Sequence, residues 1–438
     1  MKPSPSLANV GMTTFNARRP PQWFIPVKEI ERILPLLVAL VLFVTFILSF
    51  QLDDSLAQQD LPWLQSNVPT ESMDLPESQD RVHLIVVSDI PKTPSKNLWD
   101  DNPNLPSWMK DYFRWHAETR KVLDKSTWER NQYLILRCYR EDARCGGLSD
   151  RLKPVPLLLL AAARSKRLLF ISWTRPCALE EFLLPPAGGI NWTMPPWLRQ
   201  KAELNTTSRR LVTRASSVLE TVAESATIVQ THLHDASGGA SQYTEVEGEN
   251  EFYRVYHDLF RIFFEPSPYI AQRVQGKMLS HGLVPGQYAV AHYRAEYGRE
   301  VARHPKLRKP SFISGTAINA VNCASELQPG SPIFFASDNM IALEAVRSFA
   351  KKVNFPIVTF EREEANPLHL DKFDNETKPK DYTSTFVDLF LAGNGRCVAY
   401  GRGGFGRYAN MLSFNATCSK KHVKNFFSNP CEWANRKE

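Results

Sequence analysis

Residues 133–173 read YLILRCYREDARCGGLSDRLKPVPLLLLAAARSKRLLFISW, and this stretch decides the fold class of the chain. Its apolar ends, residues 133–138 and 168–173, predict two buried strands, and the run at 155–163 predicts a helix. A loop with two adjacent glycines joins the first strand to the helix. Strand and helix in alternation are typical of α/β proteins with a mainly parallel sheet, so we predict an α/β fold.

The same alternation continues on both sides of this stretch. Strands are predicted at residues 82–87, 288–292, 332–336, 357–360 and 397–400, and helices at 108–122, 211–223, 341–351 and 385–392. The sequence after residue 80 is long enough for two domains. We place an N-terminal α/β domain at residues 81–270 and a C-terminal α/β domain at 271–438.

An uncharged apolar run occupies residues 33–50. As a helix it would be about 27 Å long, close to the thickness of a bilayer core. Basic residues precede it and acidic residues follow it, which indicates a cytoplasmic tail at 1–32 and a type II transmembrane signal anchor. Residues 51–80 hold seven acidic and no basic residues and are predicted to be a solvated stem. The alternative is a cleaved signal peptide.

The rest of the chain is therefore expected in the lumen of the secretory pathway, anchored in a Golgi or endoplasmic reticulum membrane. Four sequons agree with this compartment, at Asn191, Asn205, Asn375 and Asn415. All seven cysteines follow the apolar run and none forms a C-x-x-C pair, so disulfides are favoured over metal ligation. An odd number leaves at least one thiol without a partner in the chain, and the connectivity stays open.

The net charge is +7, and the acidic stem makes the body of the chain more basic still. A basic body attracts phosphates and other anions. The charge is too dispersed to predict nucleic-acid binding, and no zinc-finger spacing occurs. There is also no P-loop, no H-E-x-x-H, no G-x-S-x-G and no D-x-D metal motif, which favours chemistry without a metal.

The first candidate site is the glycine loop in CGGLSDRL, residues 145–152. Gly146 and Gly147 permit a ligand to approach the backbone closely, and free amides at the start of a helix attract anions. The alternative is a tight turn in which Ser149 or Asp150 only caps the helix.

A second candidate site ends the strand AVAHYR, residues 289–294. Side chains alternate along a strand, so His292 and Arg294 lie on one face. Ligands bind at the carboxyl ends of strands in α/β sheets, and a permanently charged arginine suits a diphosphate. The alternative is a core histidine beside a surface ion pair.

Two further motifs end predicted strands. Ser337 and Asp338 follow the strand PIFFA and offer a hydroxyl and a carboxylate to a base or ribose; the alternative is a cap for the next helix. Gly401, Gly403 and Gly406 formally match G-x-G-x-x-G, yet the acid expected about 20 residues later for a dinucleotide is missing. A phosphate cradle in a nucleotide-sugar domain fits this loop better.

Taken together, these segments resemble the fucosyltransferase superfamily, which has a GT-B fold and includes protein O-fucosyltransferases, α1,6-fucosyltransferases and plant cell-wall fucosyltransferases. CGGLSDRL resembles its N-terminal glycine-loop motif, AVAHYR its H-x-R strand, FFASD the strand motif that follows, and VDLFLAGNGRCVAYGRGGFGRYANMLS its C-terminal donor motif. The resemblance is strongest over residues 133–173 and 286–415, and the order of the motifs is more specific than any one of them.

The resemblance implies a GT-B-like pair of Rossmann-like domains, the first on the acceptor side and the second binding the nucleotide sugar. It implies GDP-fucose as donor, inversion at the anomeric carbon, no metal or other cofactor, and a glycan or glycoprotein acceptor. The residues carried over as donor-binding are Gly146, Gly147, His292, Arg294, Ser337, Asp338, Gly403, Gly404 and Phe405.

This chain departs from the family pattern at two places. Family members often have a second arginine or an aspartate after H-x-R, where this chain has Ala295 and Glu296. Many have Ser or Thr where this chain has Gly403 and Gly404, so one hydroxyl contact to a phosphate is missing.

The implied reaction is attack of an acceptor hydroxyl on the sugar, while Arg294 and loop amides stabilise the departing GDP. Asp150 and Glu296 are the candidates for the base. Two other functions stay open: a catalytically inactive relative that binds nucleotide sugar or carbohydrate, and a dinucleotide-dependent oxidoreductase that uses the formal glycine motif.

Overall fold

The computed structural model describes residues 96–142, 145–204, 209–212, 227–231, 249–296, 309–359, 370, 378–422 and 431–434. The predicted tail, signal anchor, stem and strand at 82–87 lie outside these ranges, as do the sequons at Asn205 and Asn375. None of the helices within these ranges has the length and apolar character needed to cross a bilayer.

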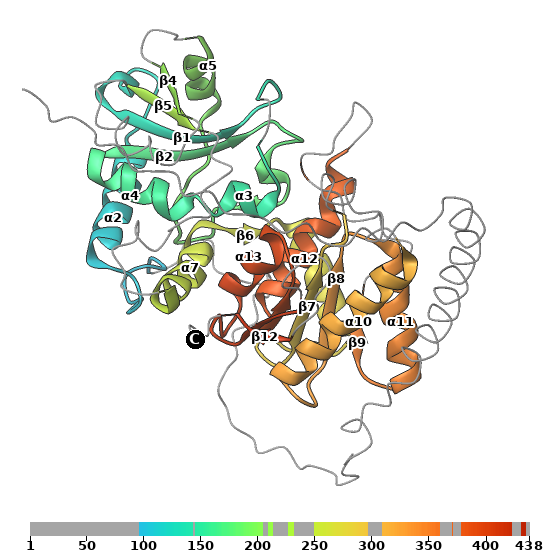
Figure 1. Ribbon diagram of the computed structural model, residues 1–438. Helices are drawn as coiled ribbons and strands as arrows, with labels where there is room; N and C mark the ends of the chain where they lie inside the picture. Colours follow the sequence, from blue (N-terminus) through green and yellow to red (C-terminus); the bar gives the residue numbers. More distant parts are fainter. Residues whose placement is uncertain are drawn as a thin grey trace, which may run out of the picture. The chain divides into compact units, whose positions relative to one another are not determined.

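The first sheet has four parallel strands in the order β2-β1-β5-β4 (Figure 1). They are β1 (Gln132–Cys138), β2 (Arg167–Trp173), β4 (Arg209–Val212) and β5 (Ile228–Thr231). β1 and β2 pair along their whole length, so both end at the same edge of the sheet. Every residue of β2 is buried, as expected for a parallel sheet covered on both faces.

Helices cover both faces of the first sheet. They are α2 (Ser107–Lys121), α3 (Leu148–Leu152), α4 (Val155–Ser165) and α5 (Pro196–Leu204). α2 and α4 share a core with Leu134 and Leu136 of β1, whereas α5 packs against the opposite face, with Tyr133 and Ile135. Alternate side chains of β1 therefore belong to two separate apolar layers, one on each face of the sheet.

The second sheet has six strands in the order β12-β11-β10-β7-β8-β9, and β12 is antiparallel to its neighbour. The strands are β7 (Ala289–Tyr293), β8 (Ile333–Ser337), β9 (Ile357–Val358), β10 (Cys397–Tyr400), β11 (Ser419–Lys421) and β12 (Glu432–Trp433). β7 and β8 are parallel, and at their carboxyl ends His292 lies opposite Ala336 and Tyr293 opposite Ser337. Polar residues at their carboxyl ends therefore become neighbours.

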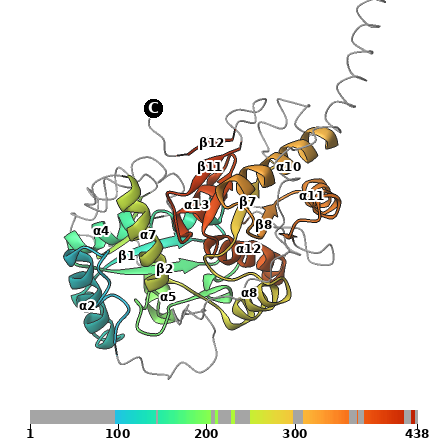
Figure 2. The ribbon, with the colours of Figure 1, turned by 90° about the horizontal axis from the view of Figure 1, so that it is seen from below.

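The second sheet is also covered on both faces (Figure 2). Its helices are α8 (Pro268–Ser280), α10 (Pro310–Leu327), α11 (Met340–Val353), α12 (Thr383–Gly393) and α13 (Gly404–Leu412). α10 and α11 pack with Ala289 and Ala291 of β7, while α8, α12 and α13 share a core with Val290. His292 is in phase with Val290 and so faces α12 and α13.

Helix α7 (Glu249–Phe263) and a short antiparallel pair, β3 (Leu183–Leu184) with β6 (Glu265–Pro266), join the two sheets. The Tyr256 hydroxyl of α7 lies 2.7 Å from the Leu152 carbonyl of α3 and 3.3 Å from the Tyr408 hydroxyl of α13. α7 therefore fixes α3 next to α13, and residues of both sheets belong to one apolar core.

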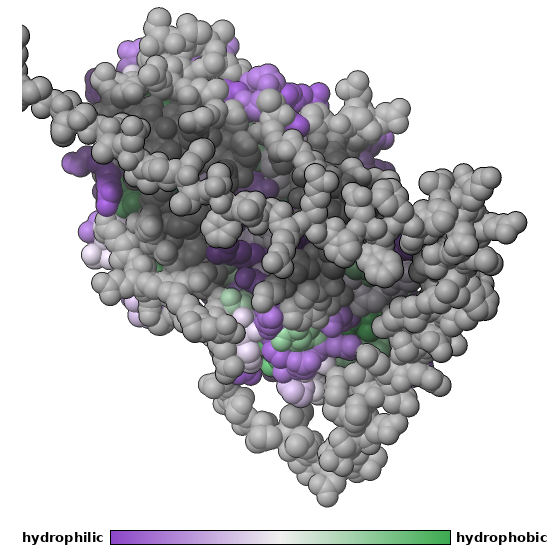
Figure 3. Space-filling model, in the orientation of Figure 1, coloured by the Kyte–Doolittle hydropathy of each residue, from purple (hydrophilic) through white to green (hydrophobic). Residues whose placement is uncertain are grey.

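On the face seen in Figure 3, hydrophilic residues form most of the described surface and hydrophobic residues occur in small areas among them. The largest fully buried side chains include Trp99, Trp173 and Trp192. Burial of each such side chain contributes roughly 2–3 kcal/mol before conformational entropy is counted.

The prediction of an α/β fold with mainly parallel sheets is confirmed. One predicted element is wrong at its start: Leu211 and Val212 lie in β4, opposite Gln230 and Thr231 of β5, instead of opening a helix. Pairing with the neighbouring strand satisfies their backbone groups and overrides the helical spacing of the apolar side chains. The other residues of that prediction, 213–223, lie outside the described ranges.

The cysteines form disulfides and leave one thiol free, as predicted. The pairs are Cys138–Cys145, Cys323–Cys431 and Cys397–Cys418, and the free thiol is Cys177. The first disulfide joins the end of β1 to the start of the glycine loop, residues 145–147.

Candidate functional site

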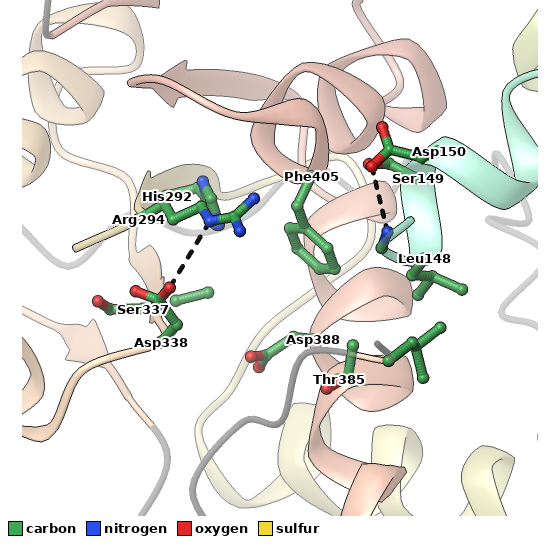
Figure 4. A pocket seen from close by; sticks show the side chains of 13 residues that line it. Leu148, Ser149, Asp150, His292, Arg294, Ser337, Asp338, Thr385, Asp388 and Phe405 are labelled. Atoms are coloured by element: carbon green, nitrogen blue, oxygen red, sulfur yellow. Dashed lines mark hydrogen bonds and ion pairs between the residues drawn. The ribbon is translucent and has the colours of Figure 1, made fainter. Parts of the chain in front are cut away.

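A cavity lies where the carboxyl ends of β7 and β8 meet α12, α13 and the glycine loop (Figure 4). The residues that line it are Gly147, Leu148, Ser149, Asp150, His292, Arg294, Ala336, Ser337, Asp338, Leu370, Thr385, Asp388 and Phe405. The glycine loop and α3, which follow the first sheet's β1, line the cavity together with the ends of β7 and β8 of the second sheet.

The glycine loop forms one wall of the cavity and is held in a tight turn. Gly146 has φ +76°, and a Cβ there would lie 2.7 Å from the Cβ of Asp150. The Gly147 N–H donates to Asp150 Oδ2 at 3.1 Å, so Asp150 caps α3. The capping alternative from the sequence is thus realised in a residue that also lines the cavity.

Arg151 fixes the loop from beneath, a role that the sequence analysis missed. Its buried guanidinium donates to the carbonyls of Gly146 (2.9 Å), Arg175 (2.5 Å) and Leu370 (3.1 Å). It also lies over the Trp173 ring, 5.1 Å from the centroid. One side chain therefore connects the loop, the end of β2 and a cavity residue that is 219 positions away in sequence.

His292 is a buried, neutral histidine at the end of β7. Burial lowers its pKa to about 3, and His422 and Arg294 act in the same direction. Its ring stacks on Phe405 with centroids 5.1 Å apart. Nδ1 has no hydrogen-bond partner among the described residues. The core-histidine alternative is therefore correct about burial, and the residue lines the cavity as well.

Arg294 lies on the same side of the cavity as His292 (Figure 4). Its side chain is 26% exposed, and Nε is 3.8 Å from Asp338 Oδ2. A guanidinium keeps its charge at any physiological pH, so Arg294 is a permanent cation at this wall, beside the Asp338 carboxylate.

Asp338 organises the chain that carries Arg294. Its Oδ1 accepts from the amides of Ala295 at 2.7 Å and Glu296 at 3.3 Å. Burial raises its pKa, against the opposite effects of the Ala295 amide and Arg294. The cap of α11 is Asn339, whose side chain accepts from the next helical amides, so the capping alternative for Asp338 is not realised.

Ser337 ends β8 with a hydroxyl that lines the cavity. The residue is 3% exposed, and its Oγ has no hydrogen-bond partner among the described residues. A buried hydroxyl without a partner is costly, so this atom is a natural contact for a ligand.

The glycines at the start of α13 permit close packing. A Cβ on Gly406 would lie 2.7 Å from His292 Nδ1 and 2.8 Å from Tyr400 Cβ, and one on Gly404 would meet Ser149. Of the three glycines in the G-x-G-x-x-G spacing, Gly406 is therefore explained by the close contact of α13 with β7 and β10. Phe405, the residue between these glycines, projects into the cavity between the two walls (Figure 4).

Asp388 is a cavity residue that the sequence analysis did not select. It is 4% exposed and lies on α12, whose residues Thr383–Gly393 are all buried. A single acid in the apolar run TFVDLFLAG was the available signal.

The remaining predicted residues lie around the cavity. Of the two base candidates, Asp150 lines the cavity, with Oδ1 3.5 Å from Lys153 Nζ, whereas Glu296 is exposed and outside the lining. Gly146, Gly403 and Gly404 lie next to lining residues without lining the cavity themselves. The described residues contain no group of three or more His, Cys, Asp or Glu side chains arranged for a metal ion.

The two sequons within the described ranges are at the surface. Asn191 is exposed and accepts from the Thr193 hydroxyl at 2.7 Å. Asn415 is partly exposed and accepts from the Thr417 hydroxyl at 2.7 Å.

No protein-family model and no curated protein sequence matches the chain. The solved structures that are similar to it include two that hold GDP. A point mutant of Arabidopsis thaliana FUT1 in complex with GDP shares 13% identity and covers 76% of this chain and 84% of its own, with a TM-score of 0.48. POFUT1 in complex with GDP shares 10% identity and covers 67% of this chain and 98% of its own, with a TM-score of 0.37. The fold and the cavity of this chain are defined by its own strands and side-chain contacts.

Proposed function

We propose that this chain is a glycosyltransferase that moves fucose from GDP-fucose to a hydroxyl of a glycan or glycoprotein, with inversion and without a metal. The observation that carries the proposal is one cavity that joins a permanent cation, Arg294, to the buried, unpartnered Ser337 hydroxyl. The order of motifs in the sequence supports the donor, and the predicted signal anchor supports a type II protein of the Golgi or endoplasmic reticulum.

The donor is expected to place its diphosphate beside Arg294. The guanidinium offers up to two parallel hydrogen bonds to phosphate oxygens, and it must weaken its 3.8 Å contact with Asp338 to do so. Asp338 stays bonded to the Ala295 and Glu296 amides, so the loop keeps its shape when the ion pair changes. Asp338 is thus a positioning residue for the diphosphate contact.

The base is expected to bind next to Asp388. Guanine presents adjacent N–H donors, which a carboxylate accepts, whereas adenine presents an acceptor at the same edge. Asp388 is a buried carboxylate of the cavity lining, and Phe405 and Leu370 supply apolar walls. This chemistry selects a guanine nucleotide.

In the reaction, the acceptor oxygen forms a bond to the anomeric carbon while the bond from that carbon to the diphosphate oxygen breaks. The negative charge that develops on GDP is stabilised by Arg294. The proton of the acceptor hydroxyl goes either to Asp150 or to solvent. One oxygen of Asp150, Oδ2, already accepts from the Gly147 amide. The Asp150→Asn variant separates the two routes, since it blocks only the first.

Thermal unfolding of the purified full-length chain with GDP, GDP-fucose, GDP-mannose, UDP, PAPS and NAD tests the proposal. A ligand at about 100 times its dissociation constant adds roughly 2.7 kcal/mol of stability. A shift with guanine nucleotides alone is expected. No shift with any of them, from a folded sample, would remove the donor site, and a shift with NAD alone would favour an oxidoreductase. GDP binding without turnover on a panel of glycan acceptors would indicate an inactive relative.

A further inference from the structure

Ser149 of α3 and Gly404 of α13 meet at the edge of the cavity. A Cβ built on Gly404 would collide with Ser149 Oγ and lie 3.2 Å from Asp150 Oδ1. Ser149 is 4% exposed and lines the cavity. The space that a side chain at position 404 would fill is therefore occupied by a hydroxyl from the first sheet's side.

We propose that Ser149 supplies the hydroxyl contact to the donor diphosphate that the start of α13 lacks, an inference that rests on the proposed function. Gly403 and Gly404, at the start of α13, have no side-chain hydroxyl to offer a ligand. Here the hydroxyl comes from α3, and residue 404 is glycine because Ser149 Oγ takes its place.

The hydroxyl is held in place before a ligand binds. Residue 149 belongs to a segment fixed by the Asp150 cap, by the Cys138–Cys145 disulfide and by the Arg151 bonds to Gly146 and Leu370. A hydroxyl that donates to an ionised phosphate oxygen makes a strong hydrogen bond, and a preset position avoids most of the ordering cost.

The contact also makes donor binding depend on both sheets. Arg294 and Ser337 belong to the second sheet, whereas Ser149 follows β1 of the first. A diphosphate held between Ser149 and Arg294 would bridge them. Binding is then sensitive to any change that separates α3 from α13.

Exchange of the two side chains in the full-length chain tests this inference, with binding of GDP and of guanosine measured by calorimetry. Ser149→Ala should weaken GDP roughly tenfold, because it removes a hydrogen bond to a charged group, and should leave guanosine unchanged. Gly404→Ser alone should also weaken GDP, because its Cβ displaces Ser149. The exchange variant Ser149→Gly/Gly404→Ser should bind GDP within about threefold of the wild type, since the hydroxyl returns to the same place.

Each outcome decides the matter. Wild-type affinity for GDP in Ser149→Ala, or an equal loss for guanosine, would overturn the role of this hydroxyl. An exchange variant that binds GDP more weakly than both single variants would overturn the shared location. A wild-type chain that fails to bind GDP would instead remove the proposed function, which keeps the two failures distinct.

Discussion

The Cys138–Cys145 disulfide should matter more for ligand binding than for stability. It closes a loop with a sequence separation of 7, whereas Cys323–Cys431 closes one with a separation of 108. The chain-entropy relation assigns about 2.5 kcal/mol of stability to the short loop and about 4.8 kcal/mol to the long one. The Cys138→Ala/Cys145→Ala variant should therefore unfold less readily than the Cys323→Ala/Cys431→Ala variant.

The effect on GDP affinity should follow the opposite order. Without the short disulfide, only the Asp150 cap and the Arg151 bonds hold Gly146 and Gly147, so we expect binding to restore part of their order. At the lower end of the range for two residues, this ordering costs about 2 kcal/mol. That cost corresponds to roughly a thirtyfold increase in Kd. Cys323 and Cys431 lie outside the cavity lining, so their replacement should leave the Kd unchanged.

Urea unfolding gives the stability of both variants, and calorimetry with GDP gives their affinity. The Cys138→Ala/Cys145→Ala variant should be the more stable of the two and should bind GDP more weakly. If the two variants lose GDP affinity equally, or if the short-loop variant keeps the wild-type Kd, then the disulfide does not hold the glycine loop in its binding form.

Three further outcomes are expected. Arg294→Ala should abolish turnover and raise the Kd for GDP at least tenfold, with no change in the Kd for guanosine. Arg294→Lys should restore part of the GDP binding, because lysine keeps the positive charge and lacks the planar guanidinium. Retained turnover in Arg294→Ala would contradict the role of this residue. Asp388→Asn should lose the preference for GDP over inosine diphosphate, which lacks the guanine amino group, in competition titrations; an unchanged preference would place the base elsewhere. Acid should destabilise the fold, because the pKa of His292 is about 3 in the native chain and about 6.5 in the unfolded chain. Between these values only the unfolded chain binds the proton, so stability falls by about 1.4 kcal/mol per pH unit for each such histidine as the pH drops. Urea unfolding from pH 7 to 5 should show a weaker dependence of the unfolding free energy on pH in His292→Phe than in the wild type.

The sequence predicted well those elements whose residues are apolar throughout. β1, β2, β7 and β10 are buried along nearly their whole length, so continuous apolar runs marked them. β4 was missed because Leu211 and Val212 also fit helical spacing and because pairing with β5 depends on residues further along the chain.

The site was predictable where it follows a strand end and not where distant segments meet. His292, Arg294, Ser337 and Asp338 end two apolar strands, and a parallel sheet brings such ends together. Arg151 bonds a carbonyl 219 residues away, a contact that no local pattern encodes. The role of Asp338 was also hidden, because the groups that donate hydrogen bonds to it are backbone amides that follow another strand.

The order in which the ribosome delivers the chain bears on how this site is completed. Arg151 leaves the ribosome 219 residues ahead of Leu370, whose carbonyl accepts one of its hydrogen bonds. At typical rates of about 5–20 residues per second, the interval is roughly 10 to 40 seconds. Until then the guanidinium under the glycine loop lacks one acceptor of its final set. A nascent chain stopped before residue 370 would have its first sheet complete and the floor of its ligand cavity unfinished.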